Sequence, residues 1–230
     1  MEIERMAIHD IPALIWGPES NRVYVCVHGK MGSKDAAQGL AQIAIEKGYQ
    51  VLSFDLPQHG ERKEERTPCD IWQGMHDLSV IGAYAFARWR DVSLFGCSLG
   101  AYFSLHAYAD RPFRKCLFQS PILDMEYLIR QMFSRFRVTE DQLTQEKEID
   151  TPIDRLRWDY YQYVLAHPVK HWPVPTNILY GGKDDLQSRT IIQDFSRRFR
   201  CQLTISEESL HPFMDEKDWP IVDKWLRENL

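Results

Sequence analysis

The sequence predicts an α/β fold in which a mostly parallel β-sheet carries helices on both faces. Short apolar runs typical of buried strands alternate along the chain with longer segments of helical periodicity. One apolar run leads into residues 96–100, read GCSLG, and a helical pattern follows at once. The length of 230 residues fits one domain of moderate size, or one domain with a small insertion.

The first half of the chain supplies most of the predicted sheet. Strands are expected at residues 3–8, 13–16, 22–27, 50–54 and 92–95, and helices at 35–47, 70–89 and 101–109. The first two strands are predicted to form an antiparallel hairpin at the sheet edge. Gly48 lies where a glycine commonly ends a helix. From Ile71 to Ala85, apolar residues recur at helical spacing, which predicts one buried face.

The second half continues the alternation after an interruption. Strands are expected at residues 115–119, 177–180 and 202–205, and helices at 190–199 and 218–228. The closing helix is predicted to turn Val222, Trp225 and Leu226 inward. Its place after the last strand completes a fold in which strands and helices alternate.

The alternation breaks between Pro121 and Pro175. Helical patterns cover residues 125–136, 139–150 and 153–166, and no clear strand is visible among them. Thr139 and Gln142 have the spacing of a capping box. We therefore expect residues 1–121 and 175–230 to form an α/β core, with residues 122–174 inserted as a helical cap. The alternative is that these are ordinary crossover helices.

Aromatic residues are frequent in the last part of this predicted cap. If they face the site, Trp158, Tyr161 and Trp172 would bind substrate and favour an apolar or aryl acyl group. Such stripes are more often part of a core, so the same side chains could instead hold the cap to the body.

Composition and charge exclude several classes of protein. The net charge of −5 argues against nucleic acid as the partner, although Arg130, Arg135 and Arg137 form a mild basic cluster. No apolar run has the length of a membrane span, and the charged N-terminus shows no signal peptide. The five cysteines form no CxxC pair, so a zinc or redox motif is not expected. We expect a reducing cytoplasm as the location.

Residues 96–100 have the pattern G-x-S-x-G between a strand and a helix, which is the context of a nucleophile elbow. The turn is so tight that Ser98 is expected to adopt a strained backbone conformation that exposes its hydroxyl. Gly96 and Gly100 allow the strand and the helix to approach without a Cβ clash. This pattern predicts that Ser98 is the nucleophile of a serine hydrolase.

A serine nucleophile needs a base, and a carboxylate to orient that base. The chain order serine, acid, histidine leaves His211 as the base, because it is the only histidine after the acid candidates. Asp184 follows the strand at 177–180 and is the first choice as acid. Asp185 and Asp124 remain open as alternatives, and each of the three could instead be a turn or helix-cap residue.

The oxyanion hole requires two backbone N–H groups directed at the developing negative charge. One is expected from Leu99, which follows the nucleophile. The second is assigned to Lys30, on the loop after the strand at 22–27. His28 on the same loop is expected to brace it, because the chain order of the triad places the base elsewhere.

The segments VCVHGKMGS, FDLPQHGER, LFGCSLGA, LYGGKDD and LHPF together resemble the α/β-hydrolase superfamily over nearly the full length of the chain. Gln58 and Arg62 depart from the usual pattern of the second segment. The resemblance implies an eight-stranded sheet with an antiparallel second strand and a small helical cap after the sixth strand. Length and cap size look like bacterial carboxylesterases, including feruloyl esterase-like enzymes.

The resemblance implies hydrolysis of a small-molecule carboxylic ester through a Ser98–His211–Asp184 triad and an acyl-enzyme, with Lys30 and Leu99 as oxyanion donors. The acyl group is expected to be small to medium, and apolar or aryl. No metal or organic cofactor is required. Alternatives are a thioester, lactone or amide hydrolase on the same triad, and a catalytically idle ligand-binding protein. A nucleotide-binding protein is not expected, because HGKMGSK lacks the phosphate-loop pattern. Oligomeric state is not predicted.

Overall fold

Eight strands form one sheet in the order β1-β2-β4-β3-β5-β6-β9-β10 in the computed structural model, which describes residues 1–230. The strands are β1 (Ile3–Ile8), β2 (Ile11–Trp16), β3 (Arg22–Val27), β4 (Gln50–Phe54), β5 (Asp91–Cys97), β6 (Cys116–Gln119), β9 (Thr176–Gly181) and β10 (Gln202–Ser206). β2 runs antiparallel to β1 and β4, and all other pairs are parallel. The predicted sheet, with its antiparallel second strand, is confirmed.

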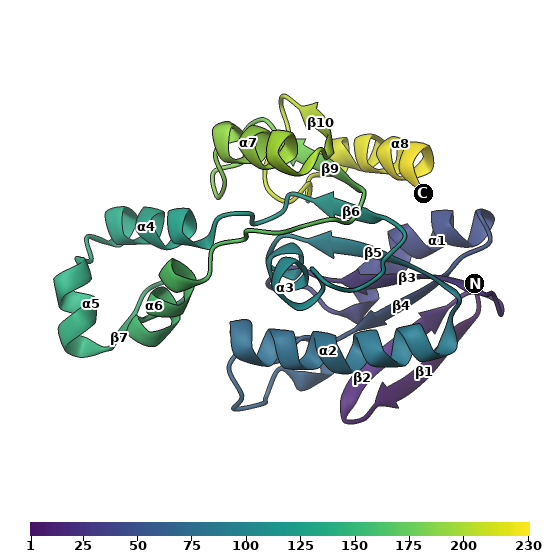
Figure 1. Cartoon of the computed structure of the whole chain (residues 1–230), viewed down its shortest axis with the longest axis horizontal. Coiled ribbons are helices and arrows are strands. Elements are labelled where there is room, and N and C mark those ends of the chain that lie inside the picture. Colours follow the sequence, from purple (N-terminus) through teal and green to yellow (C-terminus); the bar gives the residue numbers. More distant parts are fainter.

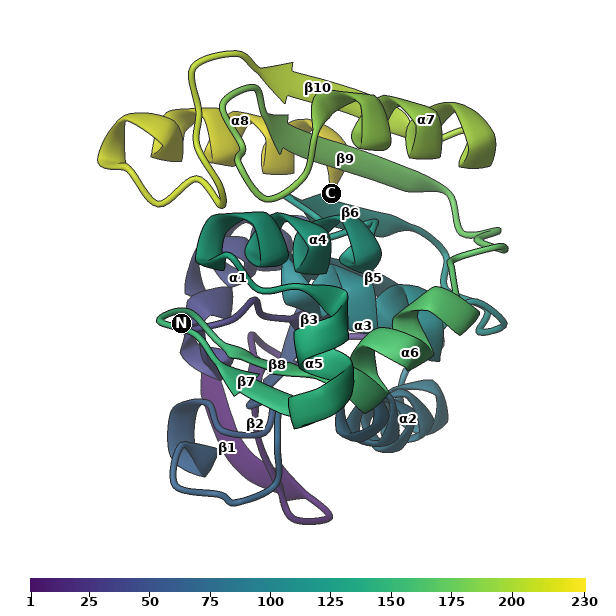
Figure 2. The ribbon, with the colours of Figure 1, turned by 90° about the vertical axis from the view of Figure 1, so that its left-hand side faces the viewer.

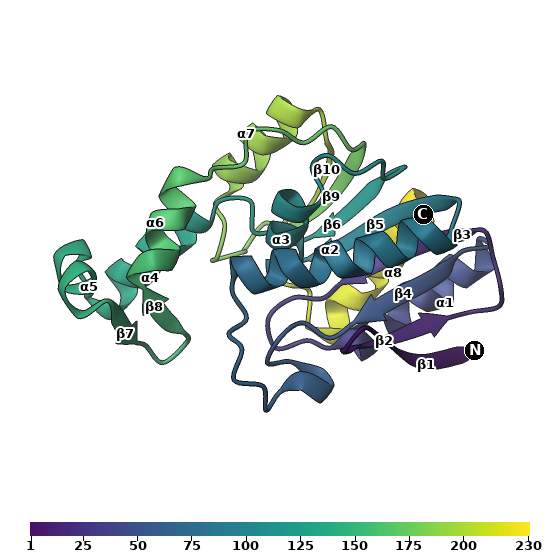
Figure 3. The ribbon, with the colours of Figure 1, turned by 60° about the horizontal axis from the view of Figure 1, so that its bottom comes forward.

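Helices cover both faces of this sheet (Figures 1 and 3). α1 (Gln38–Glu46) and α8 (Trp219–Asn229) pack on one face, whereas α2 (Ile71–Arg88), α3 (Leu99–Ala107) and α7 (Arg189–Phe199) pack on the other. Each helix buries an apolar stripe against the strands.

Local signals set the ends of several helices as expected. Asp70 caps α2 by accepting the N–H of Gln73, and Gly48 after α1 adopts a left-handed φ of 77°. The first turn of the helix predicted at 35–47 is instead a short 3₁₀ helix, Lys34–Ala37, capped by Ser33. In α8, Trp225 and Leu226 are buried, whereas Val222 is only half-buried.

Five elements lie between β6 and β9: α4 (Met125–Phe136), α5 (Glu140–Glu146), β7 (Glu148–Asp150), β8 (Arg155–Arg157) and α6 (Trp158–Ala166). The expected capping box at Thr139 is present at the start of α5. β7 and β8 pair as an antiparallel hairpin, so the expectation of helices without strands is wrong here. Each strand has only three residues, which is too short for an alternating pattern to be visible. Cross-strand ion pairs from Arg155 to Asp150 and Glu148 accompany the pairing.

This segment extends away from the sheet as an arm, with α4 passing above the β7–β8 hairpin (Figures 1 and 2). The ion pair between Arg157 and Asp70, at 2.8 Å, joins the arm to the start of α2. Trp72 on α2 makes edge-on ring contacts with Tyr160 and Tyr163 of α6. The arm is therefore anchored to the body through the N-terminal end of α2.

Two further properties concern the whole chain. No helix of the structure combines the length and the apolar character that crossing a bilayer requires. No group of three or more His, Cys, Asp or Glu side chains is arranged to hold a metal ion, and all five cysteines are free.

Candidate active site

Ser98 occupies the sharp turn between β5 and α3. Its φ of 50° and ψ of −116° lie outside the regions that side-chain-bearing residues usually adopt. The turn depends on its glycines, because a Cβ at Gly100 would lie 2.4 Å from the carbonyl oxygen of Val27, and one at Gly96 would lie 3.0 Å from Ala101 Cα. The serine is therefore held at the carboxyl ends of the parallel strands and at the N-terminus of α3.

Ser98, His211 and Asp184 form a continuous hydrogen-bonded series. Ser98 Oγ lies 2.8 Å from His211 Nε2, and His211 Nδ1 lies 2.8 Å from Asp184 Oδ2. The Asp184 side chain is fully buried, and those of His211 and Ser98 are each 8% exposed. Because the carboxylate accepts from Nδ1–H, Nε2 is free to accept the serine proton. The structure thus brings the three predicted residues together.

The second oxygen of Asp184 fixes the loop that carries it. Asp184 Oδ1 accepts the N–H groups of Leu186 at 2.8 Å and Gln187 at 3.1 Å. The two alternative acids are placed differently: Asp124 caps α4 by accepting the N–H of Tyr127 at 2.9 Å, and Asp185 is exposed. Of the three candidates, Asp184 alone contacts the imidazole.

Gln187 joins this acid loop to the start of the arm. Its Oε1 accepts the N–H groups of Leu123 and Asp124 at 3.0 and 2.8 Å, and its Nε2 donates to the Asp124 carbonyl at 2.9 Å. Gln187 is 1% exposed. The sequence gives no local signal for this connection, because the partners are more than sixty residues apart.

The loop that carries His211 is held at both ends. On one side, the Ser209 hydroxyl donates to buried Asp218 at 2.7 Å, and the Ser209 carbonyl accepts the N–H of Lys183 at 3.0 Å. On the other side, Gln119 at the end of β6 donates to the Pro212 carbonyl at 2.8 Å. These contacts restrict where the imidazole can lie, and sequence reasoning missed them.

The two expected oxyanion donors both border the space beside Ser98. The N–H groups of Lys30 and Leu99 donate to no acceptor within the chain. Leu99 is the first residue of α3, so its N–H adds to the positive end of the helix dipole. A Cβ at Gly29 would lie 3.0 Å from that of Ser98, which shows how closely the loop before Lys30 passes the nucleophile.

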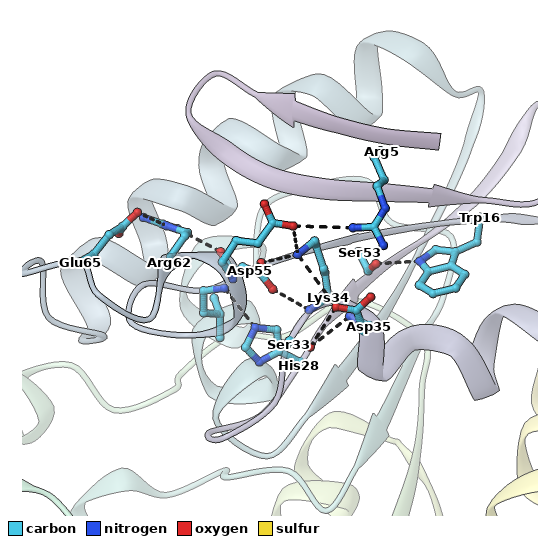
Figure 4. A network of polar contacts seen from close by, with 12 residues as sticks. Arg5, Trp16, His28, Ser33, Lys34, Asp35, Ser53, Asp55, Arg62 and Glu65 are labelled. Atoms are coloured by element: carbon cyan, nitrogen blue, oxygen red, sulfur yellow. Dashed lines mark hydrogen bonds and ion pairs between the residues drawn. The ribbon is translucent and has the colours of Figure 1, made fainter. Parts of the chain in front are cut away.

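His28 braces this loop (Figure 4). Its Nε2 accepts the N–H of Leu56 at 3.1 Å, and its Nδ1 donates to the Gly29 carbonyl at 2.7 Å. Burial lowers the pKa of His28 to about 4, so the ring is neutral at physiological pH. The ring thus acts as a hydrogen-bonding spacer between the loops after β3 and β4.

A buried ion pair fastens the same two loops (Figure 4). Lys34 Nζ lies 2.7 Å from Asp55 Oδ2, and both side chains are almost fully buried. Asp55 also accepts the N–H of Lys34 at 2.8 Å and that of Glu61 at 3.0 Å. Every oxygen of this carboxylate therefore has a partner, as a buried charge requires.

A cavity of about 250 Å³ opens beside Ser98 and extends beneath the arm. One wall is the apolar face of α4. The other apolar lining residues come from α3, α6, the hairpin and the loops: Cys69, Leu99, Ile122, Ile153, Leu156, Tyr160 and Leu186. A mostly apolar cavity with a serine hydroxyl in its lining is suited to an apolar ligand group.

The three aromatic residues predicted to bind substrate do not line this cavity. Tyr161 is fully buried beside Phe133, with its neighbour Trp158 on the same face of α6, and Trp172 stacks on Phe118. The helical period places Trp158 and Tyr161 against the inside of the arm. Trp158 and Tyr161 thus pack within the arm, whereas Trp172 joins the end of the arm to β6 of the body, which is the role that the alternative interpretation expected. Tyr160, on another face of α6, lines the cavity instead.

The cysteines near the site do not compete with the serine. Burial raises the pKa of Cys97, which precedes Ser98, and that of Cys69, which lines the cavity, to about 12 each. Both thiols therefore stay protonated near neutral pH, and a protonated thiol is a poor nucleophile.

Comparison with known proteins gives partial sequence matches. No protein-family model matches the chain. A serine hydrolase-like protein of Dictyostelium discoideum is 28% identical over 104 residues, which is 43% of this chain and 29% of that protein. The uncharacterized hydrolase YugF of Bacillus subtilis is 31% identical over 88 residues, or 38% of this chain and 32% of that protein. The matches therefore span about a third of these relatives.

Solved structures match over almost the whole chain. Est1E from Butyrivibrio proteoclasticus, solved with ferulic acid bound, has a TM-score of 0.78 at 17% identity, covering 98% of this chain and 96% of that one. Mouse alpha/beta hydrolase domain-containing protein 10 has a TM-score of 0.78 at 14% identity, with coverage of 99% and 98%. An esterase of Pyrococcus furiosus has a TM-score of 0.68 at 15% identity, with coverage of 99% and 90%. The chain therefore has the α/β-hydrolase fold.

Proposed function

We propose that the chain hydrolyses carboxylic esters, with Ser98 as nucleophile, His211 as base and Asp184 as orienting acid. The observation that carries this proposal is the series of two 2.8 Å contacts that runs from the serine through the imidazole to the carboxylate. The backbone N–H groups of Lys30 and Leu99, which lie beside the serine and have no acceptor within the chain, support it further. The names of the curated relatives, both hydrolases, agree with it.

Acylation begins when Ser98 Oγ attacks the ester carbonyl carbon while His211 Nε2 takes the hydroxyl proton. The electron pair of the carbonyl π bond moves onto its oxygen, where the N–H groups of Leu99 and Lys30 stabilise the negative charge. Asp184 stabilises the imidazolium. Collapse of the intermediate breaks the bond to the leaving alkoxide, which takes the proton from His211 and departs as an alcohol.

Deacylation repeats these steps with water as the nucleophile. His211 takes a proton from water as the hydroxide oxygen attacks the acyl carbon, and the same two N–H groups hold the second oxyanion. The bond to Ser98 Oγ then breaks, and the serine regains a proton from His211. The net reaction converts one ester and one water into an acid and an alcohol.

Residues 122–174 would act in this reaction as a cap over the site, with residues 1–121 and 175–230 as the catalytic core. The cap would supply the apolar wall of the cavity through α4 and would limit the access of water to the acyl-enzyme. The cavity volume of about 250 Å³ favours small to medium apolar acyl groups.

Labelling with a fluorophosphonate, followed by intact-mass measurement, tests the nucleophile directly. We expect one adduct per chain in the natural protein and none in Ser98→Ala, with turnover of p-nitrophenyl butyrate lost in parallel. Cys97→Ala serves as the matched control, because it changes the neighbouring residue and should still be labelled.

A thioester, a lactone and an amide belong in the same assay, because the triad chemistry is common to all four. If the folded protein forms no adduct and turns over none of them, the proposal is wrong and a ligand-binding role without catalysis replaces it.

A further inference from the structure

α4 forms one wall of the cavity along most of its own length. Met125, Leu128, Ile129 and Met132 recur at helical spacing and all line it. The N-terminal end of this wall lies at the nucleophile, since the N–H of Ile122 donates to the Ser98 carbonyl at 3.2 Å. The wall therefore starts beside the reacting atom and leads away from it.

Arg135 lies at the far end of the same wall. It follows Met132 by three residues, which places it on the same face of α4, and it lines the cavity. At a rise of 1.5 Å per residue, its backbone is about 15 Å along the helix from that of Met125. Its guanidinium carbon lies 5.8 Å from the centre of the Phe136 ring, and the side chain borders the cavity.

Arg135 is the cation of this cavity that has no acidic partner. The other three each form an ion pair: Lys30 with Asp154, Arg155 with Asp150, and Arg157 with Asp70. Arg135 forms neither an ion pair nor a hydrogen bond to any carboxylate, and its side chain is exposed to solvent. Its five N–H donors are therefore free for a ligand.

The cavity also has one acid without a partner, Asp185, and it lies at the opposite end. Asp185 directly follows Asp184, the residue that contacts the catalytic imidazole. An anionic group is thus disfavoured near the scissile bond and favoured at the distal end, with an apolar stretch between the two. This order of charges and apolar surface matches an ester that carries a remote carboxylate.

Building on the proposed ester hydrolysis, we propose that Arg135 selects esters in which an apolar chain separates the carbonyl from a carboxylate. The carbonyl would lie at Ser98, the chain would lie along α4, and the carboxylate would pair with Arg135. A planar guanidinium can bind a carboxylate through two parallel hydrogen bonds, which gives the contact direction as well as charge. The carboxylate could end either the acyl chain or the alcohol.

Matched pairs of half-esters and diesters test this selection. The pairs are the monomethyl and dimethyl esters of the straight-chain dicarboxylic acids from glutarate to sebacate, assayed by kcat/KM in the natural protein and in Arg135→Gln. We expect Arg135→Gln to lower the half-ester to diester ratio by about fivefold for the longer acids, mainly through KM. Salt at 0.5 M should reduce the ratio in the natural protein but not in the variant.

Arg137→Gln is the matched control. Arg137 is also exposed and lacks an ion pair, and it lies outside the cavity lining. Its substitution by glutamine therefore removes the same charge from the same region of the chain without changing the cavity. An equal change in Arg137→Gln would overturn the proposal. It would also be overturned if Arg135→Gln changed neither this ratio nor the turnover of hexanoate esters of 6-hydroxyhexanoate. Hexanoate esters of 6-hydroxyhexanoate locate the charge: if they respond to Arg135→Gln and the half-esters do not, the carboxylate belongs to the alcohol.

Failure of the proposed function is recognised separately. If p-nitrophenyl butyrate and all the methyl esters are left intact, ester hydrolysis is wrong. Calorimetric binding of monomethyl and dimethyl suberate to the Ser98→Ala protein, with and without Arg135→Gln, then still decides the role of Arg135. Tighter binding of the half-ester that depends on Arg135 supports selection, and equal binding contradicts it.

Discussion

At the scale of single residues, the site shows how position rather than residue type decides a role. Three aspartates were candidates for the acid, and they differ in what surrounds them. Asp184 has one oxygen on His211 and the other on two backbone N–H groups, whereas Asp124 caps a helix. A carboxylate held at both oxygens cannot rotate away from the imidazole, which is the property that an orienting acid needs.

Asp184→Asn tests this assignment with little change in shape. An amide can donate to Nδ1 and so stabilise the wrong tautomer of His211, and we expect kcat to fall by about 10³- to 10⁴-fold. Asp124→Asn keeps the helix cap and should change kcat by less than about tenfold. Rates on p-nitrophenyl butyrate check this, and an equal loss in the two variants would reassign the acid.

His106, on α3, should make the free energy of unfolding depend on pH. Burial lowers its pKa to about 4, its Nε2 has no partner, and its ring packs edge-on against Tyr102. An unfolded histidine titrates near pH 6.5, so between pH 6.5 and 4 the unfolded state binds more protons. The free energy of unfolding therefore falls as pH falls through this window.

His106→Phe should remove the part of this pH dependence that comes from the histidine. Between pH 7 and pH 5 the natural protein should lose about 2 kcal/mol more than the variant. Urea unfolding at a series of pH values measures this difference. Parallel pH curves for the two proteins would show that His106 titrates normally in the folded state.

At the scale of elements, the loops after β3 and β4 act as one unit. The Lys34–Asp55 pair and His28 tie them together, and the first loop also carries Lys30, which we propose as the second oxyanion donor. The geometry of the proposed oxyanion hole therefore depends on the Lys34–Asp55 pair and on His28, which lie outside the cavity lining.

Lys34→Met should destabilise the protein strongly, because it leaves the Asp55 carboxylate buried without its counter-charge. We expect the free energy of unfolding to fall by about 3 kcal/mol, with a loss of kcat as the loop shifts. Lys63→Met, at an exposed lysine without an ion pair, should change it by less than about 0.5 kcal/mol. Equal stability of the two variants in urea would contradict this account.

The helices and strands also show which parts of the fold can be predicted from the sequence. Long periodic segments such as α2 and α4 and buried runs such as β3 were predicted nearly to the residue, because periodicity and burial leave a strong local pattern. The β7–β8 hairpin was missed because three-residue strands leave none. In the site, the G-x-S-x-G pattern pointed to Ser98 and chain order pointed to His211, and the structure places these two side chains in contact.

The prediction that Trp158, Tyr161 and Trp172 line the cavity is wrong for a different reason. Aromatic residues were expected in the cavity, yet an apolar stripe on α4 and one on α6 look alike in sequence whether they line a cavity or fill a core. Which stripe faces the serine depends on how the arm packs, and that is a tertiary property. The contacts of Gln187 and Ser209 were invisible for the same reason.

At the scale of the whole molecule, stability is distributed unevenly. β3 is buried almost throughout and paired on both sides, whereas β7 and β8 contain one buried residue, Leu156, and pair only with each other. A short isolated hairpin contributes little stability by itself. The arm is therefore expected to open more readily than the sheet.

Native-state hydrogen exchange followed by mass spectrometry tests this distribution. Amides of α5 and the β7–β8 hairpin should exchange through local opening, at free energies well below that of global unfolding, while those of β3 and β5 should require global unfolding. If all of these peptides exchange at one common rate, the arm and the sheet unfold as a single unit.

The contacts of Gln187 have a consequence for how this protein could change over evolutionary time. Its side chain holds the start of the arm through backbone groups of Leu123 and Asp124 alone. Backbone groups are present whatever the side chain is, so this attachment places little restriction on the sequence of α4. Mutations along α4 can accumulate and alter this wall of the cavity while the loop that carries Asp184 keeps its place. The cavity can therefore come to accept new ligands without any change in the hydrogen-bonded series of Ser98, His211 and Asp184.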